Sequence, residues 1–256
     1  MFITRHIPNI LTLGNLFCGC LAVIVLIESG SFVMASWLVI LAAFFDFLDG
    51  FAARMLGVSG ELGKQLDSIA DMVSFGLVPG IIAYELLKFG LEGSSLPSEL
   101  AYAGLFVTLM SCLRLAKFNI DTRQSDQFIG FPTPAITLFW LGVPFFLLQP
   151  EALFAGEIAT DRWLAAGPCT WWLVALSILT GVALVSPFPL LALKFKTFGF
   201  KENMLRYMLI GSVVIAMVGG YFVFGNPFQP LPIVILLYFV ISLVGNASSK
   251  QETVAE

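Results

Sequence analysis

Two short stretches of this chain decide its architecture: DFLDGFAAR at residues 46–54 and, eight residues later, GKQLDSIAD at residues 63–71. Both lie in strongly apolar surroundings, so their four aspartates fall in or beside predicted membrane helices. An isolated charge at the centre of a bilayer helix costs roughly 2.5–3.5 kcal/mol. Four neighbouring carboxylates would therefore cost on the order of 10 kcal/mol before their mutual repulsion is counted. Divalent cations bind carboxylate oxygens and are the natural compensation.

The spacing of the aspartates places each pair on one helical face. Asp46 and Asp49 are three residues apart, and residues with this separation are neighbours on a helix. Asp67 and Asp71, four apart, are neighbours in the same way. The segment 56–61 between the pairs contains two glycines and a serine, which indicates a turn between antiparallel helices. Two facing helices with two carboxylates each predict a two-metal site of the kind that stabilises phosphoryl displacement.

The complete pattern, D-x2-D-G-x2-A-R-x8-G-x3-D-x3-D, resembles the signature of the CDP-alcohol phosphotransferase family at all eight fixed positions. Four other stretches resemble the phosphatidylserine synthase branch of that family: IPNILTLGNLFCG at 7–19, SFG at 74–76, RLAKFN at 114–119 and FIGFPTPA at 128–135. The last quarter of the chain carries little such resemblance. The resemblance implies an all-α membrane protein with a six-helix core.

The resemblance also implies an activity, which is transfer of a phosphatidyl group from CDP-diacylglycerol to the hydroxyl of L-serine, with release of CMP. It implies two divalent ions, Mg²⁺ or Mn²⁺, and a homodimer. The alternative within the family is the same chemistry with another acceptor, glycerol 3-phosphate or inositol phosphate.

Site residues can be assigned position by position. The metal ligands are expected to be Asp46, Asp49, Asp67 and Asp71, and the resemblance makes Asp71 also the general base. The nucleotide and CDP-lipid site is expected to include Gly50, Ala53, Arg54, Gly63, Asn9, Thr12 and Asn15. The glycines and Ala53 would allow the nucleotide to approach the helices closely, and Arg54 would pair with a phosphate. For the three polar residues near the N-terminus, ordinary capping and interhelical contacts are the alternative.

The acceptor site is expected to include Arg114, because an arginine near the inner end of a membrane span is costly and an anionic partner would explain it. The serine carboxylate is one such partner; a site carboxylate or a lipid phosphate is the alternative. Further acceptor-site candidates are Lys117, Asn119, Ser74 and Arg123. Lys117 could instead extend to the membrane interface.

Composition independently indicates an integral membrane protein. The 256 residues are 58% hydrophobic and only 12% charged, with 25 phenylalanines and a mean hydropathy of +0.92, outside the range of ordinary soluble domains. The net charge of −4 and the scattered basic residues argue against nucleic-acid binding. We expect one membrane domain over residues 1–256, with the signature at 46–71 and extra C-terminal helices at about 204–245.

Apolar runs of about 20 residues can span a bilayer, and about eight are predicted: Ile10–Glu28, Phe32–Met55, Leu66–Leu87, Leu100–Lys117, Thr133–Leu148, Thr170–Ser186, Met204–Phe224 and Leu231–Gly245. With the N-terminus inside, only Lys88 and Arg162 of the 13 basic residues fall outside. The positive-inside rule therefore places both termini and the aspartates toward the cytoplasm of a cell inner membrane. The first run is expected to be a retained helix rather than a cleaved signal.

Two other function classes use intramembrane acids. An ion-coupled transporter does not require the glycines and Arg54 at fixed offsets, so it is the weaker alternative. An intramembrane aspartyl protease needs one acid on each of two helices, and its GxGD-type signature is missing. A metal-dependent phosphatidyltransferase therefore explains the pattern best.

Overall fold

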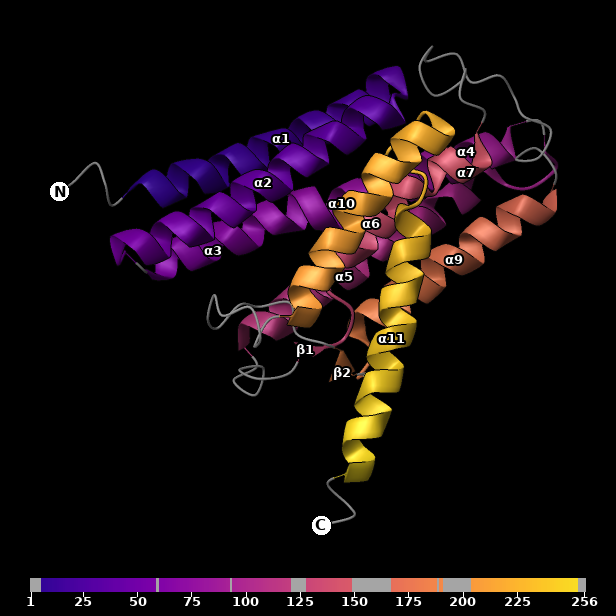
Figure 1. The fold of residues 1–256 in the computed structure, drawn as a ribbon. Coiled ribbons are helices and arrows are strands. Elements are labelled where there is room, and N and C mark those ends of the chain that lie inside the picture. The colour runs from indigo at the N-terminus through magenta and orange to yellow at the C-terminus, as the bar shows by residue number, and fades with distance from the viewer. Residues whose placement is uncertain are drawn as a thin grey trace.

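The computed structural model describes residues 6–58, 60–92, 94–120, 128–148, 167–187, 189–190 and 204–252. Within these residues the regular secondary structure is helical apart from one antiparallel pair of two-residue strands, β1 (Phe128–Ile129) and β2 (Pro189–Leu190) (Figure 1). The α-helices are α1 (Ile7–Ser29), α2 (Phe32–Leu56), α3 (Glu61–Asp71), α4 (Val78–Leu91), α5 (Phe106–Ile120), α6 (Thr133–Gly142), α7 (Pro144–Leu147), α9 (Gly167–Val185), α10 (Met204–Phe224) and α11 (Leu231–Glu252). A π-helix, η2 (Met72–Leu77), joins α3 to α4, and a 3₁₀ helix, η3 (Ser98–Leu105), leads into α5.

Four helical segments are long and apolar enough to cross a membrane: α1, α2, the continuous segment Glu61–Leu91 and the segment Ser98–Ile120. Four shorter apolar helices occupy Thr133–Leu147, Cys169–Val185, Gly211–Phe224 and Leu231–Ser242. Each predicted span thus has a helical counterpart. Large apolar side chains on the outside, such as Phe222 at 80% and Trp172 at 75% exposure, suit contact with lipid. The expected fold class, an all-α polytopic membrane bundle, is confirmed.

The first three helices lie side by side and bring the two halves of the acidic motif together (Figure 1). α2 ends at Gly57, which has φ +62°, and the Val58 N–H donates to the Ala53 carbonyl across the last turn. A residue in the left-handed conformation commonly terminates a helix, and glycine adopts this conformation without steric cost. The chain then reverses into α3, so α2 and α3 are antiparallel as the sequence predicted.

Directly after Asp71 the helix widens into the π-helix η2, where the Val78 N–H bonds to the Val73 carbonyl. Such segments leave main-chain carbonyls for other partners. Thr137 Oγ1 from α6 donates to the Phe75 carbonyl at 2.7 Å, and Thr108 Oγ1 from α5 donates to the Gly76 carbonyl at 3.1 Å. Two neighbouring helices thus fix the backbone next to the last motif aspartate.

The core lies between α4, α6 and the helices around them. Its largest fully buried side chains include Trp140 on α6, Phe75 in η2, and Ile82 and Leu86 on α4. The Trp140 indole N–H donates to Thr180 Oγ1 on α9 at 3.2 Å, which satisfies a polar atom that would otherwise be costly to bury. The core residues of α2 lie in its N-terminal half, whereas the acidic motif lies toward its C-terminal end.

Candidate active site

Three of the four motif aspartates converge between α2 and α3. Asp46, Asp49 and Asp67 each offer a carboxylate oxygen, and these oxygens all lie within 4.8 Å of one another. Asp49 is buried at 6% exposure, and the other two are half-buried. Three converging carboxylates form an all-oxygen donor set, which is what Mg²⁺ and Mn²⁺ prefer. The residues present therefore fit a divalent metal ion.

Asp71 lies at the edge of this group. Its carboxyl interacts electrostatically with the other three aspartates, and Asp46 contacts both Asp67 and Asp71. Asp71 is nevertheless outside the set of oxygens that lie within 4.8 Å of one another. This placement differs from that of the other three and leaves Asp71 available for a separate role beside them.

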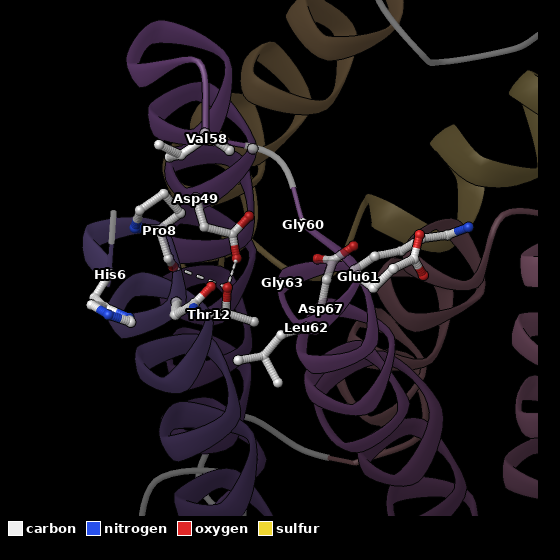
Figure 2. Close-up of a pocket in the computed structure, with 14 residues that line it drawn as sticks. His6, Pro8, Thr12, Asp49, Val58, Gly60, Glu61, Leu62, Gly63 and Asp67 are labelled. Carbon is white, nitrogen blue, oxygen red and sulfur yellow. Dashed lines mark hydrogen bonds between the residues drawn. The ribbon is translucent and has the colours of Figure 1, made fainter. Parts of the chain in front are cut away.

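A cavity of about 640 Å³ opens beside these acids. Figure 2 shows Asp49 and Asp67 projecting toward the same space from α2 and α3, with Pro8 and Thr12 of α1 on the α2 side. The predicted nucleotide-site residues that line the cavity are Asn9, Thr12, Gly50, Ala53 and Gly63. A Cβ added at Gly50 would meet nothing within 4 Å, so the glycine leaves the space beside Asp49 open.

Two polar residues of α1 bond to the aspartates rather than standing free for a ligand. Thr12 Oγ1 donates to Asp49 Oδ2 at 2.5 Å, and Asn15 Nδ2 donates to Asp71 Oδ1 at 3.3 Å. Thr12 also lines the cavity, whereas Asn15 is fully buried and does not. Thr12 and Asn15 are thus placed to orient the aspartates. This is the alternative that the sequence left open, in which these residues make interhelical contacts.

The remaining predicted residues are dispersed. Arg54 is exposed and is not among the residues that line the cavity. Ser74 is fully buried, and its hydroxyl donates to the Asn15 carbonyl at 3.1 Å, so it joins η2 to α1. Asn119 donates to Ser68 Oγ at 2.9 Å, which joins α5 to α3 one residue after Asp67.

The two basic acceptor-site candidates on α5 differ in exposure. Arg114 is buried at 6% exposure and interacts electrostatically with Asp71, and Lys117 is exposed. Arg123 lies outside the described residues. Of the two basic candidates on α5, Arg114 is therefore the one that is buried within electrostatic range of Asp71.

Three titratable side chains that line the cavity were not predicted as site residues: His6, Glu61 and Lys64. Glu61 and Lys64 lie in the first turn of α3, so their closeness to the motif was the available signal. His6 precedes α1, and only the contact between α1 and α3 brings it to the same cavity. Acidic and basic side chains thus both line the cavity.

Comparisons with known proteins show which family the chain resembles. A family model described as CDP-alcohol phosphatidyltransferase matches residues 5–183. The chain is 39% identical over 132 residues to CDP-diacylglycerol–serine O-phosphatidyltransferase of Helicobacter pylori, covering 50% of this chain and 52% of that protein. Proteins of the same name from Bacillus subtilis and Methanocaldococcus jannaschii are each 36% identical, over 130 and 146 residues. These matches cover 51% and 56% of this chain and 70% and 63% of the relatives.

The chain thus spans about half the length of the Helicobacter pylori relative. The family match is longer than half of this chain and includes the whole acidic motif and the helices that carry it. The converging aspartates and the adjoining cavity lie within it. The chain therefore belongs to the CDP-alcohol phosphatidyltransferase family.

Proposed function

We propose that this protein transfers the phosphatidyl group of CDP-diacylglycerol to the hydroxyl of L-serine, in a reaction that depends on a divalent metal ion. The observation that carries the proposal is the convergence of Asp46, Asp49 and Asp67 beside a cavity of about 640 Å³. Three close carboxylates within membrane helices need a cationic partner, and a diphosphate substrate shares such a partner. The names of the three relatives support serine as the acceptor.

In the proposed reaction the serine oxygen forms a bond to the phosphorus that carries diacylglycerol. The bond from this phosphorus to the bridging oxygen of the diphosphate breaks, and CMP leaves with that oxygen. Asp71 accepts the proton of the serine hydroxyl, and Asn15 orients the Asp71 carboxylate by its hydrogen bond. Asp46, Asp49 and Asp67 would hold the divalent metal ion, which would supply positive charge to stabilise the diphosphate and the departing CMP.

The other parts of the site are assigned by position. Asn9, Gly50, Ala53 and Gly63 line the cavity and are proposed to contact the nucleotide. Arg54 is proposed to reach a phosphate from the exposed end of α2. A cytoplasmic orientation, a homodimer and a single domain over the whole chain remain predictions from basic-residue placement and family resemblance.

A release assay tests the proposal. Purified protein in detergent is given CDP-diacylglycerol, labelled serine and either Mg²⁺ or Mn²⁺, and it should yield CMP and a labelled lipid in equal amounts. CMP release with glycerol 3-phosphate but not with serine would keep the reaction class and reject the acceptor. An absence of CMP with every acceptor and both metals would reject the reaction class.

Replacing Arg114 with Ala is expected to raise the KM for serine by at least about tenfold, because a hydrogen bond to a charged group contributes about 1.5–3 kcal/mol. The KM for CDP-diacylglycerol should change far less. The KM for serine of Arg114→Lys should lie between those of the wild type and Arg114→Ala, since lysine keeps the charge but loses the planar donor geometry. Initial rates with each substrate varied in turn provide the measurement. Cys112→Ala, at an exposed position of the same helix, is the matched control, and a larger rise in the KM for CDP-diacylglycerol would move Arg114 to the nucleotide side.

Thr12→Val is expected to weaken divalent-metal binding by about tenfold, because groups that orient metal ligands typically contribute 10- to 100-fold to affinity. Valine keeps the shape of threonine but removes the hydroxyl that donates to Asp49. Calorimetric titration with Mn²⁺ measures the effect, and Thr12→Ser should retain most of the wild-type affinity. Equal affinity in the valine variant would show that this hydrogen bond does not orient a metal ligand.

A further inference from the structure

Arg114 interacts with side chains from three different helices. Its Nη1 donates to Thr133 Oγ1 of α6 at 3.0 Å, and its guanidinium carbon lies 5.7 Å from the centre of the Phe118 ring on α5. The third contribution is Tyr238 of α11, which lies within electrostatic range of the guanidinium. The same range includes Asp71. Arg114 therefore contacts a hydroxyl group and an aromatic ring, and it lies within electrostatic range of both Tyr238 and the proposed general base.

Tyr238 belongs to the buried face of α11. Leu231, Ile235, Tyr238 and Ser242 are all nearly inaccessible, at 0%, 2%, 4% and 0% exposure, and they recur at the three- and four-residue spacing of one helical stripe. This stripe packs on α6. At the Leu231 end of this stripe, α11 and α6 approach each other so closely that a methyl group at Gly142 of α6 would overlap Pro232.

Farther along the stripe, the Tyr238 ring meets the Phe131 ring edge-on, with 6.2 Å between centres. Phe131 lies two residues before Thr133, the residue that accepts from Arg114. The contact between α6 and α11 thus extends from Gly142 to the surroundings of Arg114, and it fixes where the Tyr238 side chain lies.

This helix lies outside the part of the chain that the family model matches. The match ends at residue 183, and α11 begins at Leu231. Thr133, Phe118, Arg114 and Asp71 all fall within the match. Tyr238 therefore lies near Arg114 but belongs to a segment beyond the matched region.

We propose that Tyr238 is a positioning residue of the acceptor site, which holds the Arg114 guanidinium toward Asp71 so that it receives the carboxylate of an α-amino acid. This inference rests on the proposed function, because it takes the acceptor hydroxyl to react beside Asp71. In serine the carboxylate and the hydroxyl are separated by two carbon atoms, so one molecule can reach two neighbouring groups. Arg114 then binds the carboxylate while Asp71 receives the hydroxyl proton.

The chemistry of the guanidinium explains why its orientation matters. Arginine presents five N–H donors in a fixed planar fork, and it recognises a carboxylate well only when two donors face both oxygens. Thr133 accepts one of these donors. A tyrosine hydroxyl can accept another, and the buried α11 stripe would hold that hydroxyl in place. Loss of the Tyr238 hydroxyl alone would then loosen the orientation of the Arg114 guanidinium without opening a cavity.

Tyr238→Phe tests the proposal because it removes one oxygen and keeps the ring. The KM for serine is expected to rise about fivefold, in line with one hydrogen bond of about 1 kcal/mol. The KM for CDP-diacylglycerol and kcat should stay within about twofold of wild type, as should the thermal stability of the protein. Tyr221→Phe, on the exposed face of α10 at 61% exposure, is the matched control and should leave the KM for serine unchanged.

A double-mutant cycle separates positioning from general support of the fold. In an Arg114→Ala background, Tyr238→Phe should cause no further rise in the KM for serine, since its effect passes through the guanidinium. A full additional fivefold rise there, or an equal rise in the KM values of both substrates in the single variant, would overturn the inference. An unchanged KM for serine in Tyr238→Phe would overturn it as well.

CMP release by the wild-type protein and by Tyr238→Phe, measured with different acceptors, distinguishes the role of Tyr238 from the proposed function on which it rests. If the wild-type protein releases CMP with ethanolamine but not with serine, the proposed function fails, and the carboxylate role of Arg114 fails with it. If the wild-type protein uses serine normally while Tyr238→Phe behaves as wild type, only the role of Tyr238 is rejected.

Discussion

Asp71→Asn is expected to reduce kcat by about a thousandfold while it leaves nucleotide binding largely intact. A positioned general base typically contributes 10²- to 10⁴-fold, or about a thousandfold at the middle of that range. Asparagine keeps the size of the side chain but cannot accept the proton of the serine hydroxyl. Because Asp71 lies outside the three oxygens that converge within 4.8 Å, its replacement should leave the metal binding proposed for Asp46, Asp49 and Asp67 intact. Single-turnover CMP release and calorimetric titration with CDP measure the two effects.

Asp46→Asn provides the contrast in that experiment. Asp46 belongs to the converging group, so its replacement should weaken CDP binding as well as turnover. Glu99→Gln, an exposed acid in η3, controls for the loss of a negative charge and should behave as wild type. Wild-type turnover in Asp71→Asn would refute its role as the base. An equal loss of CDP affinity in Asp71→Asn and Asp46→Asn would instead make Asp71 a fourth metal ligand.

Removal of divalent metal is expected to abolish CMP release completely and to lower the thermal stability of the protein. Without a cation, Asp46, Asp49 and Asp67 repel one another in surroundings that solvate charge poorly. A metal ion that binds only the folded state stabilises it by about 2.7 kcal/mol at 100 times its Kd. Thermal unfolding in detergent, after treatment with EDTA and again after addition of excess Mg²⁺ or Mn²⁺, measures the shift.

A double variant, Asp46→Asn with Asp49→Asn, is the control for that measurement. It removes two of the three converging carboxylates and therefore should show no metal-dependent shift in Tm. Full CMP release by the EDTA-treated wild-type protein would remove the basis of the proposed chemistry. A metal-dependent shift that persists in the double variant would place the responsible ion elsewhere in the protein.

Much of the fold follows from local sequence. Apolar runs predicted the helices because backbone groups in a bilayer must bond within the segment. The two glycines and the serine of the segment 56–61 predicted the reversal between α2 and α3, and in the structure Gly57 caps the end of α2. The three- and four-residue spacings of the aspartates predicted that each pair shares a face, and the antiparallel turn then brings the two faces together.

Other features depend on contacts between distant segments, which periodicity cannot show. The hydrogen bond from Thr12 to Asp49 joins residues 37 positions apart, so the sequence suggested a nucleotide contact and left interhelical bonding as the alternative. Tyr238 gave no signal, because α11 is apolar on all sides and does not reveal which face is buried. Glu85, buried at 3% exposure and paired with Lys88 at 3.3 Å, was equally inconspicuous.

The π-helix after Asp71 has a consequence for how this chain can change over evolution. Each residue of a helix turns the following side chains by about 100°, so the number of residues between Asp71 and Val78 sets the phase of α4 against α3. A one-residue deletion there would keep every motif letter yet swing the core face of α4 toward lipid. Homologous chains should therefore tolerate substitutions in this segment far more readily than changes in its length.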